Sequence, residues 1–457
     1  MEAAKGKVLA VRKRAMTEEI YTTITQERLV FPNPEAETDE KAPQWIYAYE
    51  EKDGVLYLPR EFRIHDLLPD LKVADKLHDG EELGDHIRCE IKLEPYQVRP
   101  VMKARSVTAG TLVAPCGAGK TVMGLNIIYE KGRVALVLVN KESHMDQWAE
   151  SVKKFLPGAH IGFIGGRSQV YMKHRVGEND WKHADVIIAT IQTLTKGVPD
   201  EITARCGTVL VDEAHHSAAR TFVQTFRQLK PRNLLSVTAT PKRKDGLEVM
   251  YVHFLGPIFD RVTQEELRQH NRTVNPKVQF IYTNRIHHVP IIKGGYNHAK
   301  AISVVTNDDA WNEIILELCK KSEGKDRWAL VLSERVDHCT RLAEAHQARG
   351  GDAGVVTGSI GTVAEAFSHR VCFATLQLAA EGLDQPRLNT LILATPFSSE
   401  SRMIQAVGRA VRACQDKTGA LVFVLVGAHP VLYRMAQKQE EACKTQGWNT
   451  SWVKKGV

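Results

Sequence analysis

The sequence of 457 residues lacks the features that mark several protein classes. Its eight cysteines are scattered singly and none forms a CxxC pair, so no cysteine pattern suggests a zinc site or a redox dithiol. No apolar run approaches the roughly 18 to 20 residues that a bilayer crossing needs, and the first residues lack the apolar core of a secretory signal. We therefore expect an intracellular, cytoplasmic protein with reduced thiols and no membrane partner.

The charge is unevenly distributed along a chain that is too long for one ordinary hydrophobic core. Residues 1–90 hold 13 Lys and Arg against 20 Asp and Glu, a net charge of −7, while the remainder holds 48 against 34, a net charge of +14. A basic balance favours partners with a phosphate backbone, although a basic soluble enzyme would show the same balance. We predict that residues 1–90 form a small α+β accessory domain, which either binds nucleic acid or regulates the rest.

Two series of short β-branched runs follow, and each series predicts one parallel sheet. The first series consists of TLVAP, ALVLVN, VIIAT, TVLVDEA and LLSVTAT. The second series consists of VQFIYT, WALVLSE, AGVVTG, VCFATL, TLILAT and ALVFVLV. We expect two α/β lobes with ligands beyond the carboxyl ends of the strands. The predicted boundaries are 91–258 for the first lobe, 259–275 for a linker, 276–443 for the second lobe and 444–457 for a tail.

The segment APCGAGKT, residues 114–121, follows one predicted strand and precedes a stretch with helical spacing. Gly117 and Gly119 allow backbone N–H groups to surround phosphates, Lys120 can reach the β and γ phosphates, and Thr121 can bind Mg²⁺. Ala114 stands where the general pattern has its first glycine. An ordinary strand-to-helix turn is the alternative interpretation.

A second polar segment, VLVDEAH, places two carboxylates at the end of another apolar run. Asp212 can bind the metal through water, and Glu213 can polarise an attacking water. Acidic groups at a strand end also cap helices. The phosphate loop makes the catalytic interpretation the stronger one.

The segments APCGAGKT, VDEAH, SVTATP and QAVGRAVR, in this order, resemble motifs I, II, III and VI of superfamily 2 helicases with a DEAH-type box. The resemblance covers about residues 91–430. It implies two tandem RecA-like parallel-sheet lobes, ATP and Mg²⁺ as cofactors, and hydrolysis of ATP to ADP and phosphate. Four segments further resemble XPB-like and phage UvsW-like DNA helicases, namely PCGAGKT, LVNKESHMDQW, TATPKRKDG and EGLDQP.

The resemblance also assigns nucleotide-binding residues. They are Tyr96, Gln97, Pro115, Cys116, Gly117, Ala118, Gly119, Lys120, Thr121, Val122, His215, Gly382 and Asp384. Gln97 would bind adenine, although a surface glutamine near a helix start is the alternative. Thr238 and Thr240 would couple the ATP site to movement, and no transition-metal site is needed.

Gln405, Arg409 and Arg412 are the candidates for stabilising the γ-phosphate. The two arginines are three residues apart, which predicts that they share one helix face. By the resemblance both are arginine fingers, with Arg409 the stronger candidate and Arg412 alternatively paired with an acidic neighbour.

A nucleic-acid track is implied across both lobes, where hydroxyls and backbone amides would grip phosphates with little sequence preference. Its candidates are Asn140, Lys141, Thr190, Gln192, Thr193 and Arg243 in the first lobe, and Ser333, Arg335, Thr357, Gly358 and Thr375 in the second. Each of these residues could instead be an ordinary polar loop residue.

The resulting hypothesis is a monomeric, ATP-dependent DNA helicase or translocase. It would unwind or branch-migrate forked or junction DNA, or DNA at a single-strand to duplex boundary, in replication, recombination or repair. An RNA helicase, a duplex translocase that does not separate strands, and a catalytically dead nucleic-acid-binding scaffold remain as alternatives.

Overall fold

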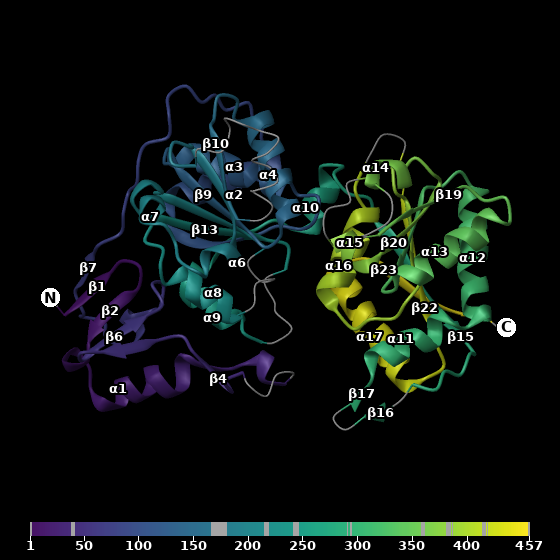
Figure 1. The fold of residues 1–457 in the computed structure, drawn as a ribbon, viewed down its shortest axis with the longest axis horizontal. Helices are drawn as coiled ribbons and strands as arrows, with labels where there is room; N and C mark the ends of the chain where they lie inside the picture. Colours follow the sequence, from purple (N-terminus) through teal and green to yellow (C-terminus); the bar gives the residue numbers. More distant parts are fainter. Residues whose placement is uncertain are drawn as a thin grey trace. The chain divides into compact units, whose positions relative to one another are not determined.

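The computed structural model describes residues 2–37, 42–165, 181–213, 219–240, 246–289, 291–292, 295–357, 362–380, 385, 387–413, 417 and 419–455. The chain divides into two compact units, Met1–Thr263 and Gln264–Val457, which are drawn in Figure 1 and are each described by themselves. Within the described ranges, no helix is long and apolar enough to span a membrane.

The first unit begins with an N-terminal module built on a five-stranded sheet of order β5-β6-β2-β1-β7. Only β1 and β7 pair in parallel; the other neighbours are antiparallel. The strands are β1 (Ala3–Lys5), β2 (Leu9–Arg12), β5 (Glu50–Lys52), β6 (Val55–Leu58) and β7 (Val73–Asp75), with a separate pair β3 (Val30–Pro32) and β4 (Trp45–Tyr47). Helical turns occur at η1 (Lys13–Ala15), α1 (Glu18–Thr22), η2 (Thr23–Arg28), η3 (Pro34–Glu37) and η4 (Ile64–Asp66). The mixture confirms the predicted α+β character.

A buried arginine fastens this module to the rest of the first unit. The side chain of Arg60 is only 1% exposed; its Nη1 donates to the carbonyl of Pro231 at 2.8 Å, and its Nε donates to Glu61 at 2.8 Å. The backbone N–H of Glu61 in turn donates to the carbonyl of His253 at 3.0 Å. Burial lowers the pKa of Arg60, so the neighbouring carboxylate is needed to hold the charge.

Lobe one, the remainder of the first unit, is a parallel seven-stranded sheet of order β10-β11-β9-β12-β13-β8-β14. Its strands are β8 (Ala109–Val113), β9 (Ala135–Val139), β10 (Ile161–Ile164), β11 (Val186–Thr190), β12 (Thr208–Asp212), β13 (Asn233–Thr238) and β14 (Ile258–Arg261). Its helices are α2 (Pro95–Ser106), α3 (Lys120–Lys131), α4 (Glu142–Phe155), α6 (Ile191–Leu194), α7 (Asp200–Arg205), α8 (Ala219–Phe226) and α9 (Glu248–Leu255). Every residue of β9 and β11 is buried, as expected for strands covered on both faces.

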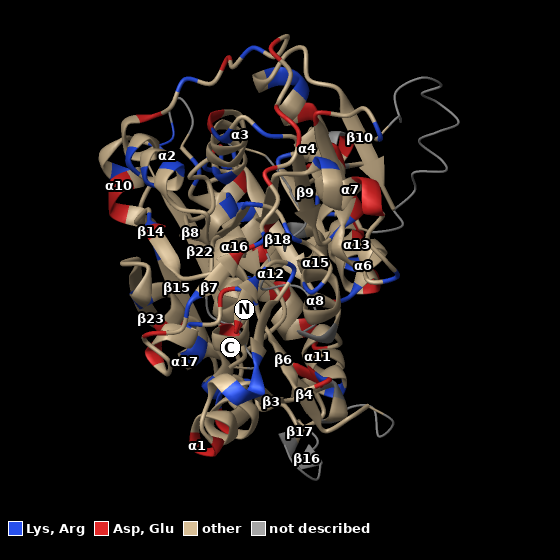
Figure 2. Ribbon diagram, turned by 90° about the vertical axis from the view of Figure 1, so that its left-hand side faces the viewer, with Lys and Arg blue, Asp and Glu red and all other residues tan. Residues whose placement is uncertain are grey.

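Strand β14 lies partly inside the predicted linker. It pairs with β8 in the sheet, and its Asp260 forms ion pairs with α2. Asp260 accepts from Arg99 at 2.9 Å and from Lys103 at 3.0 Å, both on α2, a helix that carries basic and no acidic residues (Figure 2). Burial alone would raise the pKa of Asp260, but the hydrogen bonds from Arg99 and Lys103 outweigh it and the pKa is lowered.

Lobe two, in the second unit, repeats the architecture with a parallel sheet of order β19-β20-β18-β21-β22-β15-β23. Its strands are β15 (Pro276–Thr283), β18 (Ala329–Ser333), β19 (Ala353–Val356), β20 (Val371–Thr375), β21 (Thr390–Leu393), β22 (Ala420–Val426) and β23 (Asn449–Lys455), beside a small pair β16 (Ile291–Ile292) and β17 (Gly295–Tyr296). Its helices are α10 (Gln264–Gln269), α11 (His298–Thr306), α12 (Asp309–Glu323), α13 (Val336–Gln347), α14 (Val363–Ala366), α15 (Leu376–Ala380), α16 (Glu400–Ala410) and α17 (Pro430–Thr445). Two parallel sheets flanked by helices confirm the predicted α/β fold with two RecA-like lobes.

The last strand, β23, lies inside the segment predicted as a tail. It pairs with β15 along its whole length, from Asn449 opposite Lys277 to Lys455 opposite Thr283. The Trp452 ring stacks on Phe280 with centroids 4.9 Å apart. The structure therefore makes this segment the edge of the second sheet.

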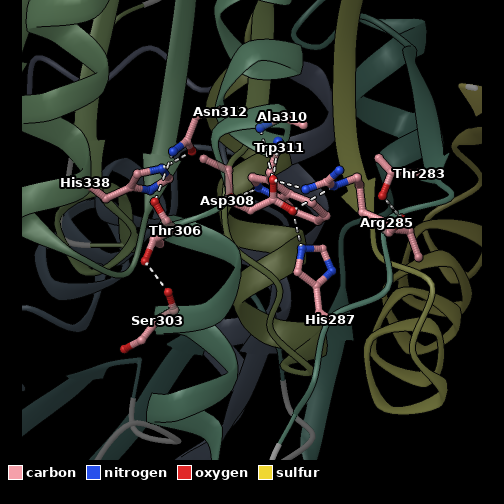
Figure 3. A network of polar contacts seen from close by, with 12 residues as sticks. Thr283, Arg285, His287, Ser303, Thr306, Asp308, Ala310, Trp311, Asn312 and His338 are labelled. Atoms are coloured by element: carbon pink, nitrogen blue, oxygen red, sulfur yellow. Dashed lines mark hydrogen bonds and ion pairs between the residues drawn. The ribbon is translucent and has the colours of Figure 1, made fainter. Parts of the chain in front are cut away.

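A carboxylate network joins the chain after β15 to the start of α12 (Figure 3). Asp308 caps the helix by accepting from the Ala310 N–H at 3.0 Å, and it also accepts from Arg285 through two guanidinium nitrogens, each at 3.0 Å. His287 Nε2 lies 2.9 Å from the same carboxylate. Burial would raise the pKa of Asp308, but the hydrogen bond from Arg285 and the helix N–H outweigh it and the pKa is lowered.

The Arg60→Ala substitution tests the attachment of the N-terminal module. We expect the free energy of unfolding of the first unit to fall by about 2–4 kcal/mol, because the buried Pro231 carbonyl loses its donor and Glu61 loses one of its two cationic partners, keeping Lys5. Urea unfolding followed by tryptophan fluorescence measures the change. Arg63→Ala is the control, since that side chain is 74% exposed and its ion pair, with Asp66, lies on the surface; its effect should stay within about 0.5 kcal/mol. Equal midpoints for the two variants would contradict a role for Arg60.

Candidate functional site

The predicted phosphate loop connects the end of β8 to the start of α3 at the carboxyl edge of lobe one. Gly117 and Gly119 have left-handed φ values of 85° and 76°, which side-chain-bearing residues adopt at a cost. Gly119 is the residue before the helix, so the N-terminal turn of α3, starting at Lys120, presents its backbone N–H groups to the loop. The loop has the conformation that an anion-binding turn requires.

Two side chains of helix α2 form hydrogen bonds with the phosphate loop. Buried Gln97 donates from Nε2 to the carbonyl of Ala118 at 2.8 Å, and its Oε1 accepts from the Glu94 N–H at 3.0 Å. The Tyr96 hydroxyl donates to the same carbonyl at 3.4 Å. In this structure Gln97, the predicted adenine contact, and its predicted nucleotide-binding neighbour Tyr96 both donate hydrogen bonds to the phosphate loop. The adenine role of Gln97 stays a prediction.

The carboxylate of Glu213 lies at the centre of the site. It is 3.1 Å from the Lys120 Nζ, and it accepts from the Thr238 hydroxyl at 2.8 Å and from the Ala239 N–H at 3.0 Å. Its backbone has a φ of 49°, a left-handed conformation that is uncommon for a residue with a side chain. The ends of β8, β12 and β13 thus bring the predicted lysine, base and coupling threonine into direct contact.

Asp212 has a different environment from its neighbour. Its Oδ2 accepts from the Trp148 indole N–H at 2.8 Å. Burial first and the adjacent Glu213 charge second raise the pKa of Asp212 to about 6, against the opposing effects of Trp148 and Lys120. The same carboxylates act on Lys120, where burial lowers the pKa but their attraction outweighs it, so the pKa is raised.

Asn140 lies at the end of β9, beside the acidic pair. Its side-chain amide donates to the carbonyl of Glu213 at 2.7 Å and approaches that of Asp212 at 3.3 Å. This predicted nucleic-acid residue therefore supports the unusual backbone at Glu213. Lys141 follows it as the N-cap residue of α4.

Trp148 is the residue that sequence reasoning missed. The helical spacing of Met145, Trp148, Ala149 and Val152 marks one buried face of α4. That pattern indicates a core tryptophan and gives no sign that its indole N–H meets Asp212. The contact depends on how α4 packs against β12.

The other predicted track residues of lobe one lie at the end of β11, next to β9 in the sheet. The hydroxyls of Thr190 and Thr193 are 2.7 Å apart, and Gln192 is exposed between them. Five predicted site residues lie outside the described part of the chain. They are His215, Arg243, Gly358, Gly382 and Asp384.

In lobe two, three predicted track residues end neighbouring strands. Ser333 ends β18, Thr375 ends β20, and Thr357 directly follows β19. Ser333 and Thr375 are paired in the strand register. The sheet therefore gathers these hydroxyl residues at one edge. Arg335, just beyond, donates from its guanidinium to the carbonyl of Ala299 at 3.0 Å.

A buried hydrogen-bond chain fixes the Ser333 hydroxyl. His338 Nε2 faces the Asn312 Oδ1 at 2.8 Å, as Figure 3 shows, and its Nδ1 is 2.9 Å from the Ser333 Oγ. The Asn312 amide donates to the carbonyl of Thr306 at 3.0 Å, so its oxygen faces the ring and must accept from it. Burial lowers the pKa of His338 to about 4, so the ring is neutral and its Nδ1 accepts a hydrogen bond from the Ser333 hydroxyl. The Ser333 hydroxyl is thus oriented before any ligand binds.

Gln405 and Arg409 lie four residues apart on α16, with Gln405 buried. The helix ends at Ala410, and the Arg412 backbone instead forms a bridge with Thr273. The expectation that both arginines share one helix face is therefore not met, because Arg412 lies beyond the helix. Their roles at the γ-phosphate stay predictions.

Comparison with known proteins agrees with this geometry. The family model described as "Type III restriction enzyme, res subunit" matches residues 90–243, and "Helicase conserved C-terminal domain" matches residues 311–414. The Escherichia phage T5 protein "Probable helicase D10" is 27% identical over 73% of this chain and 71% of its own length. The "DNA 3'-5' translocase XPB2" of Sulfurisphaera tokodaii is 27% identical over 50% of this chain and 49% of its own length.

Among solved structures, the "ATP-dependent Type ISP restriction-modification enzyme LlaBIII bound to DNA" aligns with 80% of this chain and 31% of its own, at 14% identity and a TM-score of 0.55. This likeness shows the fold. The family assignment rests on the two matched helicase domain models and on the helicase relatives. The chain belongs to the superfamily 2 helicases, ATP-dependent enzymes that act on nucleic acid, and has an XPB-type translocase and a phage helicase among its relatives.

Proposed function

We propose that this helicase acts on DNA, unwinding or branch-migrating forked or junction DNA as a monomer. One observation supports the motor function most strongly. An ion pair and a hydrogen bond connect three side chains, those of Lys120, Glu213 and Thr238. This group joins the phosphate loop, the acidic segment and the end of β13. This group contains the parts that phosphoryl transfer to water needs, namely a phosphate-binding cation and an oriented base.

In the proposed reaction, the γ-phosphate of ATP takes the place of Glu213 beside the Lys120 ammonium. The released carboxylate then orients a water molecule and accepts its proton as the water oxygen bonds to the γ-phosphorus. The bond from the γ-phosphorus to the bridging oxygen breaks, and ADP and phosphate leave. The Thr121 hydroxyl and Asp212 carboxylate would hold Mg²⁺, for which oxygen ligands of this kind are suited. The ion would neutralise phosphate charge when bound. Gln405, Arg409 and Arg412 are proposed to stabilise the charge that develops on the γ-phosphate.

Coupling to movement would run through the end of β13. The Thr238 hydroxyl contacts Glu213 and the carbonyl of Thr240, while the Thr238 carbonyl accepts from the Ala114 N–H at 2.8 Å. A change in the partner of Glu213 therefore alters the hydrogen bonds of a segment that also touches the phosphate loop. This supports Thr238 and Thr240 as the coupling residues.

The preference for DNA rests on the motif resemblance and on the DNA-translocase relative. Thr190, Ser333 and Thr375 end strands, Thr357 directly follows β19, and Thr193 lies in α6 just after β11. We propose that this set of residues contacts phosphates rather than bases. Such contacts would give little sequence preference. An RNA helicase and a duplex translocase that leaves the strands paired are the competing functions.

The steady-state ATPase rate tests the substrate. It should be measured without nucleic acid and with single-stranded DNA, duplex DNA, a fork, a four-way junction and matched RNA. We expect the largest stimulation with forks or junctions and none in Lys120→Ala, with Lys153→Ala on the surface of α4 as a control. Preferential stimulation by RNA would establish the RNA helicase. Stimulation by duplex DNA without strand separation would establish the translocase, and no hydrolysis at all would indicate a scaffold.

Glu213→Gln tests the proposed base. The amide keeps the size of the side chain and can still accept from Thr238, but it cannot take a proton from water. We expect kcat to fall by about 10²-fold or more, with ATP retained and nucleic acid bound tightly in a filter-binding assay. Turnover at the wild-type rate would exclude Glu213 as the base.

Trp148→Phe tests the environment of Asp212. Protonation of Asp212 near pH 6 should reduce kcat/KM for MgATP as the pH falls, because the metal ligand loses its charge. The Trp148 hydrogen bond lowers this pKa, so its removal should move the acidic limb of the profile to higher pH. Trp311→Phe is the matched control, since its buried indole N–H donates to the Ala394 carbonyl in lobe two. If the acidic limb of the Trp148→Phe profile stays at the wild-type pH, protonation of Asp212 is not what lowers kcat/KM.

A further inference from the structure

Three metal-ligating side chains converge at the edge of lobe one opposite the phosphate loop. His160 directly precedes β10 and Asp185 directly precedes β11, two parallel neighbours, so both residues lie at the amino ends of strands. His86 comes from the segment that leads from the N-terminal module into the lobe. The His86 Nε2 and the His160 Nδ1 lie 3.3 Å and 3.2 Å from the Asp185 Oδ2. One ligand atom from each residue lies within 4.8 Å of the other two.

The main chain brings these residues together without help from a ligand. The Asp185 N–H donates to the His160 carbonyl at 2.9 Å, and the His160 N–H donates to the Asp185 Oδ2 at 2.8 Å. The segment carrying His86 is fixed by the Arg88 N–H, which donates to the Pro157 carbonyl at 3.0 Å. The positions are therefore set by folding.

Two glycines allow the close approach of His86. At Gly158, with a φ of 97°, an ideal Cβ would lie 2.6 Å from the His86 carbonyl. At Gly84, an ideal Cβ would lie 2.2 Å from the His86 ring. Any larger residue at either position would push His86 away from the other two.

The exposure of the three side chains suits an ion that arrives from solution. The Asp185 side chain is 10% exposed, whereas those of His86 and His160 are 49% and 72% exposed. A buried carboxylate thus lies beneath two accessible imidazoles. A divalent cation neutralises the carboxylate and uses both imidazoles in their neutral form.

The distances from the Asp185 Oδ2 to the two ring nitrogens match the chemistry of one class of ion. Tetrahedral Zn²⁺, with bonds of about 2.0–2.1 Å to nitrogen and oxygen, places neighbouring ligand atoms about 3.3 Å apart. We propose that His86, His160 and Asp185 bind one Zn²⁺-type ion, with water in the fourth position. The ion fastens the segment around His86 to the amino edge of the sheet, away from the site of hydrolysis.

This segment matters because it links the N-terminal module to lobe one. The Leu83 N–H donates to the carbonyl of Gly132 at 3.0 Å, and the Val134 N–H donates to that of Glu81 at 3.0 Å, so the link already runs along the lobe as extended chain. A metal at His86 strengthens the far end of this link. The effect is on stability and leaves the ATP site unchanged.

The test is a titration of the metal-stripped full chain with Zn²⁺ by calorimetry, without nucleotide and with Mg²⁺ in large excess. A parallel Co²⁺ titration follows the visible bands of tetrahedral coordination. We expect one equivalent to bind and to raise the unfolding temperature. His86→Gln, His160→Gln and Asp185→Asn should each weaken binding by more than about tenfold. His183→Gln, an exposed histidine outside the cluster, should bind as the wild type does.

The outcomes separate this site from others in the chain. His86→Gln changes an exposed side chain, so a folded variant is available even if Asp185→Asn misfolds. Lys120→Ala should keep full Zn²⁺ binding, which makes the result independent of the proposed hydrolysis. Wild-type affinity in His86→Gln and His160→Gln, or a Co²⁺ spectrum with thiolate charge-transfer bands, would overturn the proposal.

Discussion

The ion pair between Lys120 and Glu213 is the interaction on which the ATP site depends. Both side chains are largely buried, at 14% and 13% exposure, and their charged atoms are 3.1 Å apart. Either charge alone would be costly in this position, so each residue secures the other. The pair joins the helix after β8 to the end of β12. The backbone carbonyl of Glu213 accepts from Asn140, and its carboxylate accepts from Thr238. A ligand phosphate that replaces Glu213 would therefore alter the whole group.

Most of the fold could be predicted from the sequence because central parallel strands are apolar throughout. The five runs predicted for lobe one correspond to β8, β9, β11, β12 and β13. Edge strands carried a weaker signal. β14 contains Asp260, whose burial depends on Arg99 and Lys103, more than 150 positions earlier in the chain. In β23, which lies beside β15, the alternating pattern indicates that a single face of the strand is buried. Local periodicity does not reveal these contacts. For this reason the segments predicted as linker and tail contain strands in the structure.

Part of the candidate site could also be predicted from the sequence, because several of its residues lie at the ends of apolar strands. Lys120, Glu213 and Thr238 end or follow recognisable strands, and adjacent parallel strands bring such residues to one edge. The contacts made by Trp148 and Gln97 depend on helix packing, which no motif records. The cluster of His86, His160 and Asp185 is harder still, since its members are far apart in the chain and have no characteristic spacing. The helix end at Ala410, which separates Arg412 from Arg409, also depends on the bridge to Thr273.

The close contact between Gln97 and Gly119 has a consequence for the entropy of nucleotide binding. An ideal Cβ on Gly119 would lie 2.5 Å from the Gln97 Nε2, so this position must be glycine both for its φ of 76° and for the space that the amide occupies. The amide in turn bonds to the carbonyl of Ala118. The loop is consequently ordered in the free protein, and its conformational entropy is lost during folding rather than on binding. Gln97, which is predicted to bind adenine, thus preorganises the loop that is predicted to bind the phosphates of the same nucleotide.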